Sequence, residues 1–118
     1  MTSPKDYRRG DVLTVRLDPV EGSEQGGTRP VLVVSNDVLN EALPVLMVAV
    51  ITSKKVERVF PTEVLLQAPE GGLKKTSKVL LYQVRTISKD RIKSRLGAVN
   101  ARTMSGVEQA LSLALDLP

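Results

Sequence analysis

Apolar residues along this chain mostly recur with a period of two or stand in short unbroken runs, which is the pattern of β-strands. Residues 11–17 alternate, whereas residues 30–36 and 45–52 are almost continuously apolar and predict strands buried on both faces. The run at 45–52 is the longest, so we predict that it is the central strand. The predicted strands together cover residues 11–17, 30–36, 45–52, 62–66, 78–84 and 95–99.

The period becomes helical after Asn100, which is a suitable N-cap. An apolar stripe at Met104, Val107, Leu111, Ala114 and Leu115 then predicts a C-terminal amphipathic helix of about four turns. Shorter helical turns are predicted at 37–43 and at 88–92, the second one capped by Ser88.

Several short strands followed by one helix predict a mostly β fold, a small and partly open antiparallel barrel with a C-terminal α-helix. The length of 118 residues is that of one domain, here taken as residues 1–118. A barrel of this size cannot enclose a site, so its chemistry is expected on loops or on a concave face.

Composition removes several kinds of chemistry. The chain has no Cys and no His, which excludes disulfides, thiolate chemistry, the usual general base and the usual zinc ligand. One Phe, two Tyr and no Trp argue against a reader that relies on aromatic stacking. No apolar run reaches the roughly 18 residues of a membrane span, and residues 1–10 lack the apolar core of a signal peptide. These features predict a soluble cytoplasmic protein without a membrane partner.

The net charge of +4 is unevenly distributed along the chain. Residues 1–50 hold five Lys or Arg against seven Asp or Glu, and residues 51–118 hold twelve against six. The second half is therefore the candidate for contact with a polyanion, although a solvated basic surface explains the charge equally well. Five lysines, on two predicted loops, would suit the track of a nucleic-acid backbone: Lys54, Lys55, Lys74, Lys75 and Lys78.

The segment "DPVEGSEQGGTRP" (18–30) is an unusually long connection between two strands, since such connections are usually about two to five residues. Its glycines allow a ligand to approach the backbone closely, and Pro30 fixes the entry to the next strand. Arg29 offers a guanidinium to a phosphate, or it pairs with Asp18 or Glu21 to close the loop.

Two strand ends carry further polar candidates. Thr52 and Ser53 end the run at 45–52, where their hydroxyls could donate to a phosphate, although Thr is also common in ordinary strands. In "QVRT" (83–86), Gln83 and Arg85 should share one face, with Val84 toward the core. The amide suits a base edge and the arginine suits a phosphate, while a surface salt bridge is the plainer alternative.

These segments, taken in order, resemble the MazF/PemK toxin endoribonucleases of bacterial toxin–antitoxin pairs. The resemblance rests on "RRGDV", "LDPVEGSEQGGTRPVLVVSND" with a later Asn40, "VAVITS", "PTEVLL" and "GGLKKTSKVLLYQVRTISKDRI", and it runs from about residue 9 to residue 117. It implies an SH3-like barrel of the MazF/CcdB type, a homodimer, a cognate antitoxin partner, and cleavage of single-stranded RNA (mRNA) without metal or cofactor.

The resemblance also implies roles for individual residues. By likeness, Arg29 and Thr52 occupy the family's catalytic positions, and the RNA groove would be lined, partly across the dimer interface, by Ser23, Glu24, Gln25, Ser53, Gln83 and Arg85. The chain departs from the family at Tyr82, where many members carry a carboxylate that is in some proposed as the base. A phenol, with a reference pKa of about 10, fills that role poorly.

The chemistry expected is attack of the RNA 2′-hydroxyl on its own phosphate, which leaves a 2′,3′-cyclic phosphate and a 5′-hydroxyl. A guanidinium stabilises a phosphorane but is a poor base, so Arg29 would stabilise charge and assist proton transfer while Thr52 donates a hydrogen bond. Glu24 is the nearby carboxylate that could accept a proton, or it contacts a base.

Three other functions remain open at the level of sequence. The first is a toxin of the same fold that poisons a protein such as gyrase, which would need neither the Arg29–Thr52 pair nor "QVRT". The second is a non-catalytic SH3-like nucleic-acid-binding module, which would tolerate loss of Thr52. The third is an inactive family member, which Tyr82 suggests.

Overall fold

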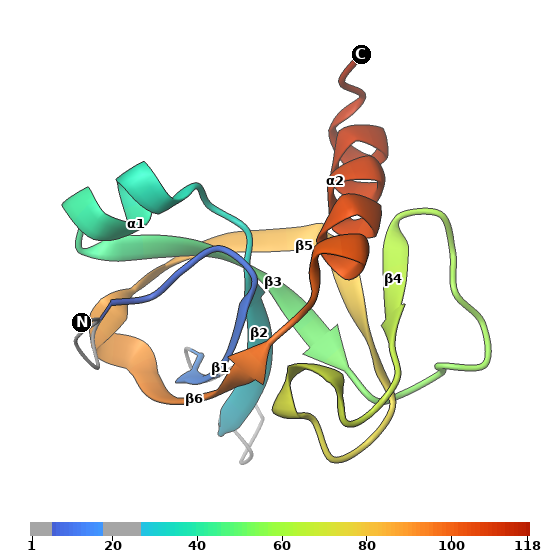
Figure 1. Ribbon diagram of the computed structural model, residues 1–118, viewed down its shortest axis with the longest axis horizontal. Helices are drawn as coiled ribbons and strands as arrows, with labels where there is room; N and C mark the ends of the chain where they lie inside the picture. The colour runs from blue at the N-terminus through green and yellow to red at the C-terminus, as the bar shows by residue number, and fades with distance from the viewer. Residues whose placement is uncertain (1–5, 18–26) are drawn as a thin grey trace.

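The computed structural model describes residues 6–17 and 27–118 (Figure 1). Its strands are β1 (Asp11–Arg16), β2 (Thr28–Val33), β3 (Val45–Thr52), β4 (Glu63–Leu66), β5 (Ser77–Ser88) and β6 (Ile92–Ala98). Its helices are α1 (Asp37–Ala42) and α2 (Ala101–Leu115), with single 3₁₀ turns η1 (Glu70–Gly72) and η2 (Lys89–Arg91). Every strand and helix predicted from the sequence is confirmed, but β5 and β6 are longer than predicted because each continues into the segment around η2.

All six strands form one antiparallel sheet in the order β4-β5-β3-β2-β1-β6, which confirms β3 as a central strand. The sheet curls strongly, and within the described part of the chain its edge strands β4 and β6 do not pair with each other (Figure 1). The predicted partly open barrel is therefore a curved sheet that is not closed.

Alternation along the strands divides the core into two clusters, one on each face of the sheet. Val12, Leu32 and Ile51 point to the face that α2 covers, where Val107 and Ala110 complete the cluster. Their strand neighbours fill the inside of the curl, in a second cluster of Leu13, Val15, Leu17, Val31, Val33, Leu46, Val48 and Ile87. Because both faces are buried, the sequence of these strands is almost continuously apolar.

The turn η1 fills the space between the two edges of the sheet. Gly72 has φ +76°, and a Cβ on this residue would lie 2.0 Å from the carbonyl oxygen of Leu96 in β6. A Cβ on Gly97 would lie 2.8 Å from the carbonyl carbon of Gly71. The two backbones therefore approach each other as closely as glycine allows, which brings the β4 side of the sheet against β6.

Helix α2 begins as the sequence predicts, with the Asn100 side chain accepting from the Thr103 backbone N–H at 2.8 Å. Glu70 in η1 adds a second anchor, since its Oε2 accepts from Asn100 N and from Thr103 Oγ1. The predicted apolar stripe is right over its first turns and wrong at its end, because Leu115 is 59% exposed. No helix in the described ranges is long and apolar enough to cross a membrane.

Candidate active site

Arg29 and Thr52 lie at the ends of neighbouring strands. The β2–β3 ladder ends with Val31 opposite Val50, and Arg29 and Thr52 stand two residues beyond this last pair, one on each strand. Both residues line one groove of ≈ 690 Å³, in which Arg29 is exposed and Thr52 is half-buried.

The groove is cationic over an apolar floor. Lys54, from the segment after β3, and Lys74 and Lys75, from the segment before β5, line it together with the buried Ile51 and Leu73. Among the described residues that line the groove, none carries a carboxylate. This wall attracts a polyanion and has, within the described residues, no acidic group that would repel one.

The hydroxyl of Thr52 is held in place by the chain that follows it. Its Oγ1 accepts a hydrogen bond of 3.1 Å from the Lys54 backbone N–H. An oxygen that accepts in this way keeps its own proton free to donate. The site therefore combines an exposed guanidinium, an oriented hydroxyl donor and three ammonium groups, which are the groups that stabilise extra charge on a phosphate.

Comparison with known proteins identifies the family of the chain. Residues 8–115 match the profile of the PemK-like, MazF-like toxins of type II toxin–antitoxin systems. The chain belongs to this family. The match covers almost the whole chain, including the strands that carry Arg29 and Thr52.

Relatives and solved structures of MazF-type toxins extend the match. The chain is 41% identical over 110 residues to the endoribonuclease MazF of Staphylococcus saprophyticus, covering 93% of this chain and 92% of that protein. It is 42% identical over 110 residues to the endoribonuclease EndoA of Bacillus subtilis, covering 93% and 95%. A mycobacterial endoribonuclease solved in complex with its cognate antitoxin superposes with a TM-score of 0.78 at 28% identity, covering 95% and 97%. A MazE–MazF complex from Deinococcus radiodurans gives 0.78 at 26%, covering 96% and 98%.

Within this MazF-family fold, Gln83 and Arg85 do not join the groove of Arg29 and Thr52. Both are exposed on β5 with Val84 turned toward the core, as their alternation predicts. Lys78, however, is the residue opposite Thr52, whereas Val84 and Arg85 lie opposite Ala49 and Val48, three and four residues back along β3, roughly 10–13 Å at about 3.3 Å per residue. The predicted strand end at residue 84 is wrong, because β5 continues to Ser88.

A bulge in β5 contains Gln83 and ends next to Val84 and Arg85. The β3–β5 ladder pairs Ala49 with Val84 but Val50 with Leu80, so β5 carries extra residues between the two pairs. A bulge re-aims the side chains beside it and strengthens the local twist. Ser53 does line the groove, as predicted, whereas Ser23, Glu24 and Gln25 lie outside the described residues.

Lys78 corrects another prediction, since it is buried and does not belong to the exposed lysine track. Its Nζ donates to Glu63 Oε1 at 2.9 Å and to the carbonyl oxygen of Arg58 at 2.8 Å. The side chains of Lys78 and Glu63 are only 6% and 3% exposed. Sequence reasoning missed Glu63, for which the only signal was a single carboxylate inside a predicted strand.

Tyr82 also contacts Glu63. Its hydroxyl donates to Glu63 Oε2 at 3.4 Å, while the ring is 55% exposed. Burial alone would raise the pKa of Glu63, but the hydrogen bonds from the Phe60 N–H and from Lys78 outweigh it, so the pKa is lowered. A carboxylate is thus present within hydrogen-bonding reach of Tyr82, but it is ionised, buried and already paired.

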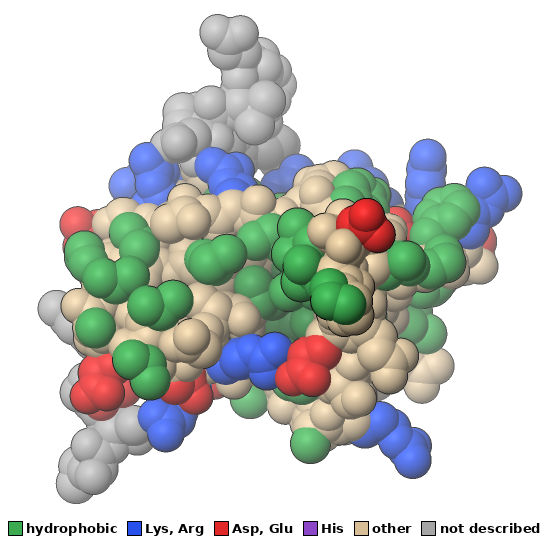
Figure 2. Space-filling model, turned by 90° about the horizontal axis from the view of Figure 1, so that it is seen from above, with side chains coloured by type: hydrophobic (Ala, Val, Ile, Leu, Met, Phe, Trp, Pro, Cys, Tyr) green, Lys and Arg blue, Asp and Glu red, His purple; other side chains and the backbone are tan. Residues whose placement is uncertain are grey.

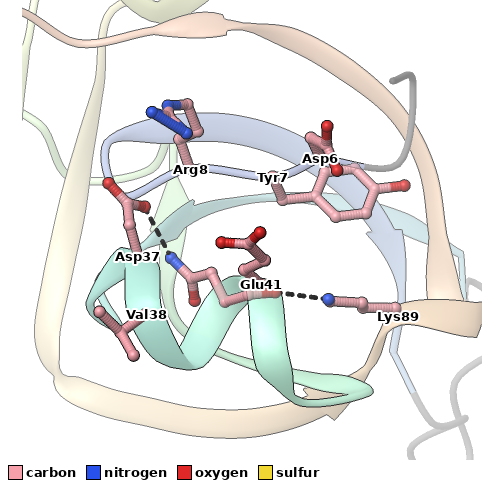
Figure 3. A pocket seen from close by; sticks show the side chains of 8 residues that line it. Asp6, Tyr7, Arg8, Asp37, Val38, Glu41 and Lys89 are labelled. Carbon is pink, nitrogen blue, oxygen red and sulfur yellow. Dashed lines mark hydrogen bonds between the residues drawn. The ribbon is translucent and has the colours of Figure 1, made fainter. Parts of the chain in front are cut away.

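A second polar pocket lies between the N-terminal segment and α1 (Figure 3). The polar side chains that line it form hydrogen bonds with one another or with the neighbouring backbone. Asp37 accepts from the Arg9 backbone N–H at 2.7 Å, the first cause of its lowered pKa, and from Asn40 Nδ2 at 3.1 Å. The side-chain amide of the buried Asn40 also donates to the backbone carbonyl oxygen of Ser35. The backbone carbonyl oxygen of Asn40 accepts from the Lys89 ammonium. Asn40, which contributed to the family resemblance, is therefore a structural residue that fixes α1 to the sheet.

An apolar hollow lies beside α2 on the face seen from above in Figure 2. Met47, Tyr82, Val84 and Leu115 are among the residues that line it. Further exposed apolar residues lie on α1 and toward the C-terminus: Val38, Leu39, Leu43, Leu113 and Leu117. Exposed apolar side chains gathered on one face are typical of a surface that another protein covers.

Proposed function

We propose that this MazF-type toxin endoribonuclease cleaves single-stranded RNA in the groove of Arg29 and Thr52, without metal, through attack of the RNA 2′-hydroxyl on the adjacent phosphate. The products are a 2′,3′-cyclic phosphate and a 5′-hydroxyl. The observation that carries this proposal is the cationic groove, which the Arg29 guanidinium from β2 and the Thr52 hydroxyl from the end of β3 line together. We further propose a single toxin domain over residues 1–118 that acts on mRNA in the cytoplasm.

The roles of the two catalytic residues follow from their chemistry. As the 2′-oxygen attacks, charge grows on the non-bridging oxygens of the phosphate, where Arg29 and the Thr52 hydroxyl donate hydrogen bonds. Lys54, Lys74 and Lys75 hold the neighbouring phosphates and add positive potential. A donor that is already oriented costs no reorganisation when the charge appears, which favours a Thr hydroxyl fixed by Lys54 N.

The proton of the 2′-hydroxyl must be accepted by a group other than Arg29 or Lys. Because the described lining of the groove contains no carboxylate, Glu24 is the candidate acceptor, on the segment that leads into β2 next to Arg29. Ser23 and Gln25, on the same segment, are proposed to contact the unstacked bases. Glu63 is unsuited to the role because its charge is already used by Lys78.

Gln83 and Arg85 are proposed to contact RNA beyond the catalytic groove, on a surface that a second copy of the chain completes. The apolar hollow beside α2 and the exposed side chains around it supply the contact for a homodimer. Related structures are complexes with a cognate antitoxin, so a cognate antitoxin is the second proposed partner. A short acidic chain would suit the basic half of this protein.

The experiment that tests this function is cleavage of a mixed-sequence RNA in EDTA, followed by analysis of the new ends. Cuts at a defined sequence, leaving cyclic phosphate and 5′-hydroxyl ends, are expected. Folded protein that leaves the RNA intact would contradict the proposal and favour a gyrase-directed or non-catalytic member of the fold. Cuts that leave 5′-phosphate ends would contradict the proposed attack by the 2′-hydroxyl.

A further inference from the structure

The segment between β3 and β4, residues 53–62, carries an exposed aromatic ring. Phe60 is the only Phe of the chain and is 50% exposed. It lines a pocket of ≈ 320 Å³ with Lys55, Glu57, Arg58 and Lys78. The Arg58 guanidinium and the Lys78 ammonium each lie 6.0 Å from the centroid of the ring. An exposed aromatic ring among cations is the combination with which proteins hold unpaired nucleotides.

The ring stands on a rigid support. Phe60 N donates to Glu63 Oε1 at 3.0 Å, and Glu63 N donates back to Phe60 O at 2.8 Å. The same Oε1 accepts from Lys78, whose Nζ also bonds to Arg58 O. The side chains of one buried ion pair therefore hold the backbone at Arg58 and at Phe60. A surface that is ordered before binding loses little conformational freedom when a ligand arrives.

The ring also lies on the same face of the sheet as the catalytic groove. Thr52 is paired with Lys78 across β3 and β5, and Glu63 is paired with Leu80 across β4 and β5. Opposite residues, and residues two apart on one strand, share a face, so Thr52, Lys78 and Glu63 all point to the side away from α2. The backbones of the neighbouring strands that carry Thr52 and Lys78 are about 4.8 Å apart. The side chain of Lys78 then reaches toward Phe60, with its ammonium 6.0 Å from the centroid of the ring.

The two sites are joined along the chain as well. Lys54 lines the groove of Thr52, and the next residue, Lys55, lines the pocket of Phe60. In Figure 1 the segment runs from the end of β3 around the outer side of β4. A strand of RNA that lies over the Arg29–Thr52 groove is thus led by cationic side chains toward the ring.

We propose that Phe60, with Arg58 and Lys55, forms a stacking subsite for one unpaired base of the RNA, a few nucleotides to one side of the scissile phosphate. The pocket is near the lower end of the roughly 300–1,000 Å³ of small-molecule sites, which suits a single nucleobase. The ring stacks on the base, and the two cations bind the phosphates on either side of it. This inference rests on the proposed function in so far as it takes single-stranded RNA as the ligand.

The test measures binding and cleavage separately, on RNA in which each base around the cleavage site is removed in turn. Binding is measured with a 2′-O-methyl group at the scissile nucleotide, which prevents cleavage. For the unaltered protein, one abasic position on one side is expected to weaken binding by about 5- to 100-fold. Phe60→Ala should weaken binding of intact RNA by a similar factor, so that KM rises while kcat is retained. In this variant, removal of the base at that one position should no longer weaken binding.

Two further variants separate stacking from folding. Phe60→Tyr should bind as the unaltered protein does, and Phe60→Leu, which keeps an apolar side chain on the turn, should bind RNA weakly although it folds. Val59→Ala, a change at the neighbouring and similarly exposed residue, is the matched control and should have no effect.

The outcomes distinguish this inference from the proposed function. If Phe60→Leu binds intact RNA as tightly as the unaltered protein, or if every abasic penalty persists in it, the stacking subsite is refuted even though the RNA is still cleaved. If the unaltered protein binds RNA with the penalty at one position but does not cleave, the subsite stands and the proposed cleavage fails.

Discussion

At the scale of single residues, the most unusual feature near the groove is the buried ion pair of Lys78 and Glu63. Removing two charges from water is costly, and the pair is stable only because Glu63 also accepts from Phe60 N and Lys78 donates to Arg58 O. The pair thereby holds the segment that leads from the catalytic groove to β4. It belongs to the fold, and its effect on RNA is indirect.

Replacement of Glu63 by Gln should lower the free energy of unfolding by about 3–5 kcal/mol near neutral pH, because it leaves the Lys78 ammonium buried without a counterion. The pKa of Glu63 is lowered in the folded state, so its stabilisation is fully present above the ordinary glutamate pKa of about 4.3 and is lost as pH falls through the lower folded value. Urea unfolding between about pH 7 and pH 3 should therefore show a smaller loss of stability in Glu63→Gln than in the unaltered protein. Glu57→Gln, a change at an exposed residue of the same segment, is the control. If Glu63→Gln and the unaltered protein lose equal stability in acid, the ionised buried Glu63 is not the source of the pH dependence.

At the scale of elements, the backbone contact between η1 and β6 completes the curl of the sheet. It depends on the absence of a side chain at Gly72 and Gly97, not on any single strong bond. The sequence "PEGGL" predicts a turn there, but no period or spacing shows that this turn meets a strand that begins twenty residues later.

Gly72→Ala should lower the free energy of unfolding by about 2 kcal/mol or more, because alanine is strained at φ +76° and its Cβ would meet the Leu96 carbonyl oxygen at 2.0 Å. Gly106→Ala is the opposite case. It lies inside α2, where a Cβ would find its nearest neighbour, in Val64, at 3.9 Å. Alanine is the better helix former, so this variant should gain about 0.5–1 kcal/mol. Thermal unfolding of the two variants should move in opposite directions, and a shift of both in the same direction would contradict this account of the contact.

The same scale shows what the sequence could and could not predict. Strand positions followed from alternation, and the α2 cap followed from Asn100, because these are local signals. The resemblance named Arg29 and Thr52 as a pair, whereas the local pattern gave no strand pairing that would bring them into one groove. The predicted strand end at 84 was wrong, because β5 runs to Ser88 with a bulge that the local pattern does not show. The resemblance assigned Gln83 and Arg85 to the RNA groove, partly across a dimer interface, and that assignment stays a prediction.

At the scale of the whole molecule, the two sides of the sheet have different surfaces. The side away from α2 carries the cationic groove and the Phe60 pocket, and the face seen in Figure 2 carries the apolar hollow beside α2. A toxin with a second copy on its apolar face leaves the cationic side open to RNA. The exposed C-terminal part of α2, which contradicted the predicted core stripe at Leu115, is explained if it belongs to that contact.

The double variant Met47→Glu and Leu113→Glu should convert the proposed dimer to a monomer, since it places two carboxylates on the apolar face. Sedimentation equilibrium or light scattering of the two proteins measures the change directly. Val59→Glu, which introduces the same charge at a comparably exposed residue in the β3–β4 segment, should leave the dimer intact. A double variant that stays dimeric would show that the contact lies on another surface.

The central claim is that the groove of Arg29 and Thr52 performs the cleavage, and single-turnover kinetics of Arg29→Ala test it most directly. With protein in excess over RNA, we expect the rate of the chemical step to fall by about 10²- to 10³-fold or more, while the Kd for non-cleavable RNA changes little. Lys74→Ala, in the same groove, should show the converse, with weaker and less salt-dependent binding and an unchanged rate at saturation. An Arg29→Ala protein that cleaves saturating RNA at the original rate would contradict the claim.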